Sequence, residues 1–371
     1  MQTRRRALRG PPDRSRLRKI LGRAIWEISA IGQRGLLLSM NWSICDPAMT
    51  TAPWDFGISK ELGMVDARLR EMVKSQEQTL TEASMHVIEA GGKRLRPTVT
   101  ILSYKSFGGT DNRKIVEIAA GFELIHSATL IHDDINDGGS TRRGRVTVYK
   151  KYGLHDAIVT GDFLFAKAFQ IGGVFDKVVV ETTAKACASL AEGEILQNKY
   201  RHKTDLTIDT YLSVMERKTA QPISAGAMVG AYLAGASAEE IDSIGKYGLN
   251  LGIAFQIIDD VLDFTGDEKK TGKAAGNDLR EGNLTLPSLL AIKSSDEARK
   301  AVLEVIANEE PALESVRRVT ELISRTDALE KARGMGEYYG IEALQSLGCL
   351  SNNGYSKGLR DLVARVLARE A

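Results

Sequence analysis

Residues 130–137 read LIHDDIND and residues 255–264 read FQIIDDVLDF, and these two stretches decide the fold and the chemistry. In each stretch, aspartates recur four residues apart (Asp133 and Asp137, Asp259 and Asp263), which places both carboxylates on one face of a helix. Like charges at this spacing destabilise a helix by about 0.2–0.5 kcal/mol, and unpaired carboxylates in apolar surroundings are far more costly. Because both clusters follow apolar residues, we predict that they face each other across the interior of a helical bundle.

The two clusters together predict a site for divalent cations. Mg²⁺ takes one or two carboxylates, keeps several waters and shares the rest of its shell with phosphate oxygens. For one cluster alone, a solvated acidic helix end is an equally good interpretation. The second cluster makes that interpretation much weaker.

Basic residues recur near the predicted helix ends. Residues 91–97 read GGKRLRP, where two glycines permit close approach of the backbone to a ligand and three cations favour phosphate. Arg142 and Arg143 follow the first acidic cluster after one short loop, and Lys218 and Lys273 lie near other helix ends. Each is also compatible with an ordinary surface charge. Together they predict a site for two polyanions, one held through Mg²⁺ and the other held directly by Lys and Arg.

Helical periodicity begins at Ile58 and continues through most of the 371 residues, of which 43% are hydrophobic. We predict one all-α domain over residues 51–371, with a large central bundle and a new helix after Pro97. Breaks between helices are expected at residues 91–92, 108–109, 138–139, 172–173, near 235, at 266–276 and at Pro311.

Residues 1–50 form a basic extension. Nine Arg and one Lys against three acidic residues give residues 1–48 a charge of +7, so the remainder carries −5 of the net +2. A disordered tail, a start codon assigned too early (with Met40 or Met49 as the true start) and an organellar presequence all fit this composition. The main body is not basic, so we expect no nucleic-acid partner.

The cysteines indicate the compartment. Cys45, Cys187 and Cys349 are far apart and form no CxxC pair, which favours a reducing, cytoplasmic location over a disulfide framework or a zinc site. Import into an organelle through the Arg-rich N-terminus is the alternative. The longest apolar runs are shorter than a membrane span, so we do not expect an integral membrane protein.

The motifs resemble those of the trans-isoprenyl diphosphate synthases, also called polyprenyl synthetases. The similarity runs from about residue 58 to the C-terminus and includes GGKRLRP, LIHDDIND, STRRGR, GDFLFAKAF, EGEILQ, ERKTAQP, FQIIDDVLDF and GKAAGNDLREGNLTLP. The resemblance implies an isoprenoid-synthase bundle around a deep central cavity, usually in a homodimer. It also implies three Mg²⁺ ions, with Mn²⁺ as an alternative, and two substrates, isopentenyl diphosphate and an allylic diphosphate.

By motif match, the resemblance assigns roles to individual residues. Asp133 and Asp137 would bind two of the ions and Asp259 the third, and Asp263 is also expected among the metal residues. Asp134, Asp260 and Asp263 would complete the acidic shell, partly through water. The allylic diphosphate would be held by Arg142, Lys218 and Lys273, and isopentenyl diphosphate by Lys93, Arg96, His126 and Arg143. Thr219 and Gln256 would line the reacting groups. His126 also lies two helical turns before Asp133 on the same face, although a buried core histidine is the alternative. Asn283 stands where many relatives have Lys, with Arg280 as a possible substitute.

Product length depends on the helix that ends at Asp133. Ala128 and Thr129, one turn earlier, are small, whereas short-chain members of the family often carry an aromatic residue here. Ile125 and Phe122 lie further along the helix, and Phe122 is a candidate for the channel floor. We therefore expect a long-chain product, such as the precursor of a quinone side chain.

Four other functions are also compatible with the sequence. They are a short- or medium-chain (geranylgeranyl or farnesyl) diphosphate synthase, the catalytic subunit of a heterodimeric synthase, a terpene cyclase, and a non-catalytic partner subunit. A cyclase usually has an Asn/Ser/Glu pattern in its second metal motif, and a non-catalytic subunit often loses an acidic cluster. This chain has neither feature.

Overall fold

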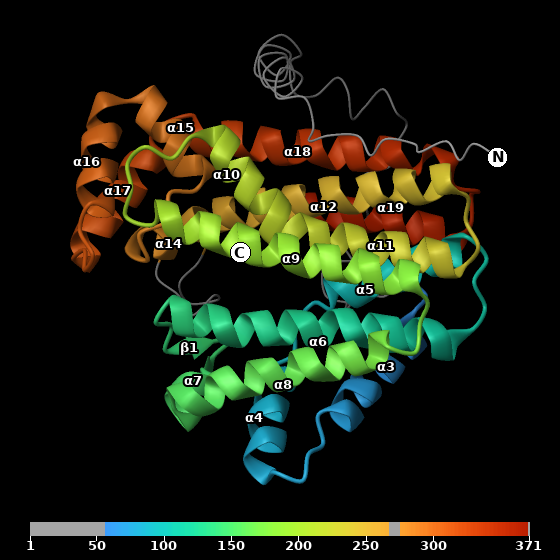
Figure 1. Ribbon diagram of the computed structural model, residues 1–371. Helices are drawn as coiled ribbons and strands as arrows, with labels where there is room; N and C mark the ends of the chain where they lie inside the picture. The colour runs from blue at the N-terminus through green and yellow to red at the C-terminus, as the bar shows by residue number, and fades with distance from the viewer. Residues whose placement is uncertain (1–55, 267–274, 370–371) are drawn as a thin grey trace, which may run out of the picture. The chain divides into compact units, whose positions relative to one another are not determined.

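A computed structural model describes residues 56–266 and 275–369. These residues form helices almost throughout, which confirms the predicted all-α class (Figure 1). The basic extension at residues 1–50, Cys45 and Lys273 lie outside the described residues, so the predictions for them stay predictions.

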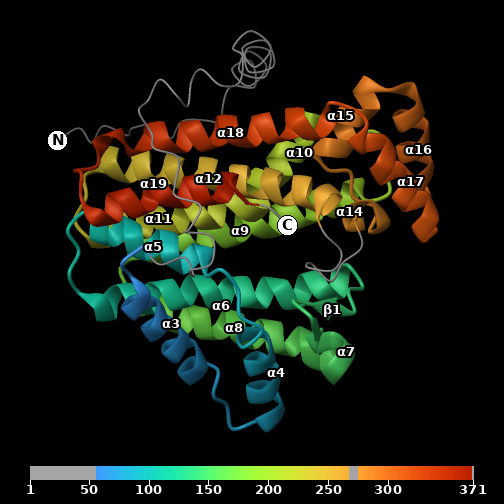
Figure 2. The ribbon, with the colours of Figure 1, turned by 180° about the vertical axis from the view of Figure 1, so that it is seen from behind.

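Long helices run side by side through the domain, as two opposite views show (Figures 1 and 2). They are α5 (Leu95–Ser106), α6 (Asn112–Asn136), α8 (Leu154–Gly172), α9 (Lys177–Tyr200), α11 (Gln221–Leu233), α12 (Ala238–Thr265), α18 (Ala328–Ser346) and α19 (Gly354–Leu367).

Shorter elements connect and flank the long helices. They are α3 (Ser59–Met72), α4 (Gln78–Ile88), β1 (Thr141–Arg142), β2 (Arg145–Val146), α7 (Val148–Tyr152), α10 (Ile208–Met215), the π-helix η2 (Glu216–Ala220), α14 (Asn277–Arg280), α15 (Leu286–Ser294), α16 (Asp296–Ile306), α17 (Leu313–Ser324) and the 3₁₀ turn η3 (Leu347–Cys349).

Small residues allow the central helices to approach closely. α12 packs against α11 and α18, α11 packs against α5, and α6 packs against α8. A Cβ atom on Gly252 of α12 would lie 2.6 Å from Cα of Ala220, and one on Gly230 of α11 would lie 2.4 Å from the carbonyl oxygen of Thr100. Side chains at these positions would push the helices apart, so the glycines set the spacing of the bundle.

The helix boundaries follow from local sequence signals. Among the described residues, a helix ends before or at each break predicted at a glycine pair or at Pro311, and Gly172 is the last residue of its helix, α8. Asp111 caps α6 by accepting hydrogen bonds from the backbone N–H groups of Arg113 and Lys114, and Ser237 and Glu240 form a capping box at the start of α12. One boundary was predicted wrongly: α5 begins at Leu95, before Pro97. Proline is tolerated in the first turn of a helix, where its missing N–H has no partner to lose.

A hairpin of two short strands was not predicted. β1 and β2 pair antiparallel, with Arg143 and Gly144 as the two-residue loop between them. Both loop residues have positive φ angles (52° and 73°), as a type I′ turn requires. This turn directs the side chains of Arg142 and Arg143, which are adjacent in sequence, to different partners.

In the part of the chain that the structure describes, one helix, α6, is long and apolar enough to cross a membrane by length and composition. In the fold, 78% of its apolar window is buried by other parts of the chain. It therefore has the burial of a core helix, whose apolar residues pack against other helices.

Candidate active site

The C-terminal end of α6 places Asp133 beside a lysine from another helix. Nζ of Lys218 lies 3.6 Å from Oδ1 of Asp133 and 2.5 Å from Oε2 of Glu194, and it donates a hydrogen bond to Oε1 of Gln197 (3.0 Å). Glu194 was not among the predicted site residues, although it belongs to the EGEILQ motif. Two carboxylates from different helices therefore share one lysine.

This group carries more negative charge than Lys218 alone neutralises. Burial raises the pKa of Asp133 to about 6, and Glu194 and Asp137 add to the increase while Lys218 opposes it. Burial alone would lower the pKa of Lys218, but Asp133 and Glu194 outweigh it and raise that pKa. Lys218 therefore stays charged, and the surplus negative charge favours a further cation.

Lys218 is positioned by an unusual turn. It lies in the π-helix η2, a wider turn between α10 and α11 of the kind that often marks functional sites. The backbone N of Lys218 would lie only 2.8 Å from a Cβ atom on Gly193 of α9. The absence of a side chain on Gly193 thus lets η2 approach α9 and brings Lys218 to Glu194.

Arg142 and Arg143 leave the hairpin in different directions. Nε of Arg142 donates a hydrogen bond to Oδ1 of the buried Asp134 (2.6 Å). The guanidinium of Arg143 packs on the backbone of Gly92, where a Cβ atom would lie 2.6 Å from Nη1. The group that lies close to the glycine pair in this structure is Arg143, and the predicted approach of a ligand to this pair stays a prediction.

Asp137, the last aspartate of the first cluster, contacts a residue that sequence reasoning missed. Nη2 of Arg201 lies 2.8 Å from Oδ1 of Asp137, and Nη1 donates to the carbonyl oxygen of Asn136 (2.9 Å). Arg201 follows α9 directly and belongs to none of the motifs quoted above. No pattern in a single sequence marks it as part of the site.

The second cluster lies on α12 and contacts the C-terminal end of the described chain. Nη2 of Arg369 lies 2.5 Å from Oδ1 of Asp259, and its guanidinium carbon lies 4.7 Å from the centroid of the Phe255 ring. Arg369 was not predicted either. Each aspartate proposed as a principal metal ligand thus has a basic side chain within 4 Å: Asp133, Asp137 and Asp259 with Lys218, Arg201 and Arg369.

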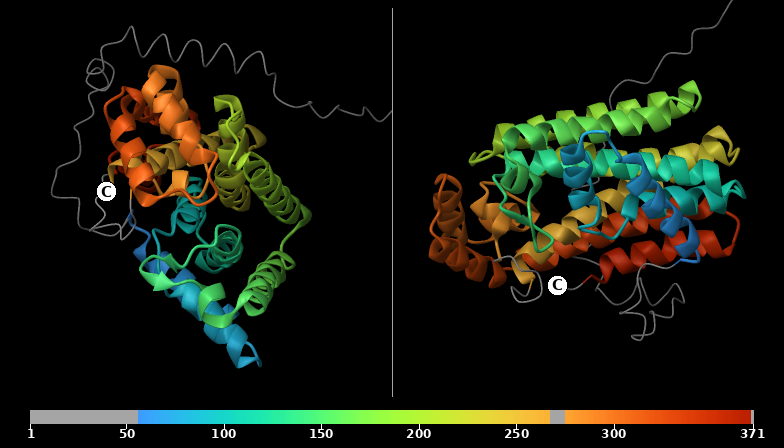
Figure 3. Two further views of the ribbon diagram at one scale, coloured as in Figure 1. Left: turned by 90° about the vertical axis from the view of Figure 1, so that its left-hand side faces the viewer. Right: turned by 90° about the horizontal axis from the view of Figure 1, so that it is seen from below.

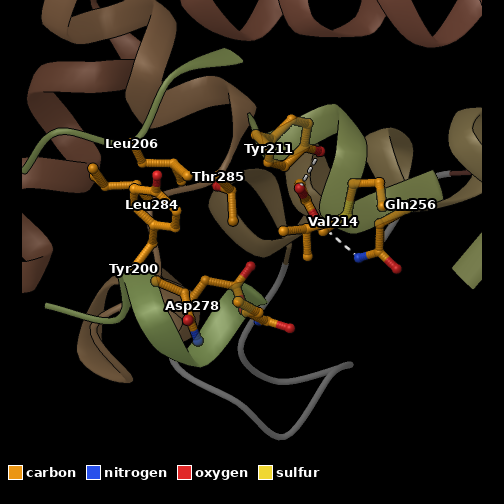
Figure 4. A pocket seen from close by; sticks show the side chains of 12 residues that line it. Tyr200, Leu206, Tyr211, Val214, Gln256, Asp278, Leu284 and Thr285 are labelled. Atoms are coloured by element: carbon orange, nitrogen blue, oxygen red, sulfur yellow. Dashed lines mark hydrogen bonds between the residues drawn. The ribbon is translucent and has the colours of Figure 1, made fainter. Parts of the chain in front are cut away.

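Asp260 is buried behind this cluster. The hydroxyl of Tyr211 donates to Oδ2 (2.5 Å) and Nε2 of Gln256 donates to Oδ1 (2.9 Å), while Thr219 contacts Gln256 in turn (3.3 Å). Burial raises the pKa of Asp260 to about 7. Tyr211, Gln256 and Asp260 line a pocket of about 500 Å³, open mouth included, together with Gln197, Tyr200, Leu206, Val214, Met215, Asp278, Asn283, Leu284 and Thr285 (Figure 4).

Asp263 holds the segment that follows the second cluster. Its two oxygens accept hydrogen bonds from the backbone N–H groups of Asn277 (3.2 Å) and Asp278 (3.1 Å). This contact fixes the start of α14. Its predicted role as a metal ligand stays a prediction.

The basic residues predicted to bind the second diphosphate lie in one region. Burial, Arg96 and Arg143 lower the pKa of His126 well below its usual value, so this imidazole is neutral at pH 7. Burial also lowers the pKa of Arg96, and partial burial and Arg369 lower that of Lys93. Arg94, which was not selected from GGKRLRP, instead pairs with Asp66 (3.0 Å) and Glu123 (2.8 Å). The surplus of cations over carboxylates suits an anion.

The two acidic clusters share these surroundings. Lys93 interacts electrostatically with Asp259 and Arg143, Arg96 with Asp133, and Arg143 with Asp134. Nε of Arg201, which contacts the first cluster, also donates to the carbonyl oxygen of Glu281 beyond the second cluster (2.8 Å). Both clusters and the basic region therefore border one site.

The donor set fits a hard divalent cation. Within residues 56–266 and 275–369, no three His, Cys, Asp or Glu side chains converge as a complete metal cage. Mg²⁺ does not require one, because it binds through one or two carboxylates and completes its shell with water and substrate phosphates. Asp133, Asp137 and Asp259 supply carboxylate oxygens of this kind.

Three of the four residues predicted to set product length belong to hydrophobic clusters, and the fourth, Thr129, lies outside them. Ala128 and Ile125 belong to the main hydrophobic core, which also contains Leu164 and Ala168 of α8. Phe122 belongs to a separate small cluster with Ile118 of α6 and with residues of α9 and α11, namely Val179, Ala186, Ala225 and Val229. Thr129 is buried, one turn before Asp133, and its hydroxyl donates to the carbonyl oxygen of His126 (2.8 Å).

Comparison with known proteins agrees with this architecture. A sequence model described as Polyprenyl synthetase matches residues 77–323, more than half of the chain. The solved polyprenyl synthase from Caulobacter crescentus CB15, complexed with calcium and isoprenyl diphosphate, superposes with a TM-score of 0.81 at 35% identity, covering 85% of this chain and 96% of that one. The helical architecture is therefore the isoprenoid-synthase fold.

Two relatives of similar sequence are named for products of different chain length. The heptaprenyl diphosphate synthase component 2 of Geobacillus stearothermophilus is 38% identical over 84% of this chain and 97% of the relative. The geranylgeranyl diphosphate synthase of Saccharolobus solfataricus is 36% identical over 82% of this chain and 95% of the relative. The chain therefore belongs to the polyprenyl synthetase family of prenyltransferases.

Proposed function

We propose that the chain is a Mg²⁺-dependent trans-polyprenyl diphosphate synthase that condenses isopentenyl diphosphate head-to-tail (1′–4) with an allylic diphosphate. The observation that carries the proposal is the convergence of two aspartate clusters and a cation-rich region on one site. Asp133, Asp137 and Asp259 would hold Mg²⁺. When bound, the cations neutralise charge that develops on the leaving diphosphate.

The other side chains of the site bind the two diphosphates and exclude water. Lys218 and Arg142, together with Lys273 outside the described residues, hold the allylic diphosphate and stabilise it as its C–O bond ionises. Lys93, Arg96 and Arg143 hold isopentenyl diphosphate so that its double bond attacks the carbocation. His126 is neutral and binds as a hydrogen-bond partner. The condensation leaves a new carbocation, which loses a proton from the adjacent carbon to the departing diphosphate as the C–H electron pair forms the new double bond. The buried surroundings of Thr219 and Gln256 exclude water.

An assay of the purified chain tests this function. The expected result is a prenyl diphosphate product from isopentenyl and farnesyl diphosphates with Mg²⁺, its loss with EDTA and its recovery with Mg²⁺ or Mn²⁺. A hydrocarbon formed from the allylic diphosphate alone would instead identify a cyclase. No turnover by the chain alone, with turnover after addition of a second subunit, would identify half of a heterodimer.

We further propose a long-chain product, such as a quinone side-chain precursor, with Phe122 at the channel floor. Support comes from Thr129 and Phe122, which are buried on the face of α6 that ends at the half-buried Asp133, and the residue nearest the aspartate is small. The wild-type enzyme is expected to extend farnesyl diphosphate well beyond twenty carbons. A main product of fifteen or twenty carbons would favour the short- or medium-chain alternative.

Replacing Phe122 by alanine is expected to lengthen the product. The change removes an aromatic ring from the cluster with Val179 and Val229, and each further turn of α6 is about 5.4 Å, comparable to one isoprene unit. Reversed-phase chromatography of the dephosphorylated products would show a shift to longer chains. Phe107→Ala, on a residue in the other core cluster, is the control and is expected to leave the product distribution unchanged.

We also propose that the chain forms a homodimer through α8 and α9. Eight of the ten exposed large hydrophobic residues in the described ranges lie on these helices or in the loop between them: Leu154, Ile158, Val159, Phe169, Val174, Val178, Val180 and Ile195. The two helices lie along the same side of the bundle in the end-on view (Figure 3, left). Apolar surface of this kind marks protein–protein contacts.

Phe169→Asp is expected to convert a dimer to monomers, since Phe169 is 59% exposed and a charge there opposes burial. Sedimentation velocity would show the change in mass, and Leu313→Asp, on an exposed residue of α17, is the control. A wild-type monomer that dimerises only with a different subunit would contradict the homodimer.

For location, we propose the cytoplasm. The support is the sequence, in which Cys45, Cys187 and Cys349 are far apart and form no CxxC pair. Cell fractionation that finds the protein in an organelle would instead support residues 1–50 as a presequence.

A further inference from the structure

Arg201 contacts two segments that are far apart in sequence. Its Nη2 and Nη1 atoms bind the carboxylate of Asp137 and the carbonyl oxygen of Asn136 at the end of α6, and its Nε atom donates to the carbonyl oxygen of Glu281. The three distances are 2.8, 2.9 and 2.8 Å, and the side chain is only 20% exposed. A planar guanidinium offers donors in several directions at once, which the single ammonium of lysine does not match in geometry.

His202, the next residue in the chain, fixes the backbone position of Arg201. The backbone N–H of His202 donates to the carbonyl oxygen of Gly282 (2.9 Å), and its ring contacts the carbonyl oxygen of Ile306 (3.2 Å). His202 has a positive φ angle of 56°, and a Cβ atom on Gly282 would lie 2.4 Å from its ring. Arg201 and His202 thus pack closely on the Glu281–Gly282 turn, so the direction of the guanidinium is fixed by the backbone.

The turn leads back to the second acidic cluster. Glu281 follows α14, and the first two residues of α14 donate their backbone N–H groups to Asp263. A continuous path of contacts therefore runs from Asp137 through Arg201, the Glu281 turn and α14 to Asp263. Each step of this path is either a hydrogen bond or the covalent backbone of residues 277–281.

We propose that Arg201 is a positioning residue that orients the carboxylate of Asp137 and ties the first acidic cluster to the second. The part of this inference that concerns divalent cations rests on the proposed function. Arg201 engages Oδ1 of Asp137, while Oδ2 accepts no hydrogen bond or ion pair from the described part of the chain. The guanidinium therefore holds one oxygen of the carboxylate and leaves the other, Oδ2, available to a divalent cation. Loss of such an outer contact typically weakens metal binding by about 10–100-fold.

The experiment compares three variants with wild type: Arg201→Ala, Arg201→Lys and Arg68→Ala. Arg68 is the matched control, because it also joins two segments, with ion pairs of 2.8 Å to Glu71 and to Glu117, and is 27% exposed. One readout is Mn²⁺ binding in the presence of inorganic diphosphate, measured from the electron paramagnetic resonance signal of the free ion. The other is amide hydrogen exchange of residues 281–283 in metal-free protein.

Arg201→Ala is expected to weaken Mn²⁺ binding by about 10-fold or more and to speed exchange of residues 281–283. Arg201→Lys is expected to recover part of the Mn²⁺ affinity by donating one hydrogen bond to Asp137, with little recovery of slow exchange. Arg68→Ala is expected to change neither readout. If Arg201→Ala does not fold, Arg201→Gln takes its place with the same expectations.

Wild-type Mn²⁺ affinity and slow exchange in Arg201→Ala would overturn the inference, and so would an equal loss of affinity in Arg68→Ala. The outcome for the proposed function is separate. If wild type binds no Mn²⁺ with diphosphate, the metal role of Asp137 fails, and exchange at residues 281–283 still decides whether Arg201 ties the two segments.

Discussion

Asp133→Asn is expected to lower kcat by about 10³-fold with little change in the stability of the metal-free protein. The substitution keeps the shape of the side chain but removes the charge that would hold a cation beside Lys218, and groups that stabilise developing charge are worth factors of this size. Steady-state turnover of farnesyl and isopentenyl diphosphates at saturating Mg²⁺ would measure the loss.

The thermal stability of Asp133→Asn shows whether a loss of activity comes from unfolding. Burial raises the pKa of Asp133 to about 6, so at pH 8 the folded protein carries a charged group that its surroundings disfavour. Asparagine removes this charge, and the thermal unfolding temperature at pH 8 is expected to stay the same or rise. Asp242→Asn, which alters an exposed pair with Lys246, is the control. Near-normal turnover by Asp133→Asn would contradict the metal role of the first cluster.

Lys218→Met is expected to reduce both activity and stability. Lys218 lies between Asp133 and Glu194, whose side chains are 19% and 16% exposed, so its loss leaves two carboxylates without their shared cation. Removing one partner of a buried ion pair costs about 3–5 kcal/mol. The loss of a diphosphate contact is expected to lower kcat by about 10²-fold as well. Urea unfolding and steady-state kinetics measure the two effects.

A second substitution separates the two effects. Adding Glu194→Gln to Lys218→Met removes one of the unpaired charges and is expected to restore part of the free energy of unfolding. The same double variant is expected to regain no activity, because neither change supplies a cation for the diphosphate. Recovery of activity together with stability would mean that Lys218 serves only the fold.

Much of the fold was predictable because its signals are local. Glycine pairs interrupt helices wherever they occur, so the breaks at residues 91–92 and 138–139 needed no tertiary information. The clusters around Asp133 and Asp259 were predictable for a related reason, since regularly spaced carboxylates in apolar sequence require a compensating cation. Arg94, which the resemblance left out of the predicted site, pairs with Asp66 and Glu123 in the structure, while the binding roles of Lys93 and Arg96 stay predictions.

The missed residues act through long-range contacts. Arg201 lies 64 positions from Asp137 and 80 from Glu281, and it is one arginine among many charged residues at helix ends. Arg369 reaches Asp259 from beyond the end of α19, which no periodicity indicates. The Arg143–Gly144 turn was missed because two-residue strands give no alternating pattern.

The π-helical turn at Glu216–Ala220 determines what the deletion of one residue would do to this region. A π-helical turn holds one residue more than the α-helical hydrogen-bonding pattern, so deletion of a single residue would let α10 and α11 merge into one regular helix. Each residue of an α-helix advances by about 100°, so one half would rotate by that angle relative to the other. Tyr211 and Ala220 would no longer both meet α12, so a deletion of one residue here is expected to disturb the packing of both helices on α12.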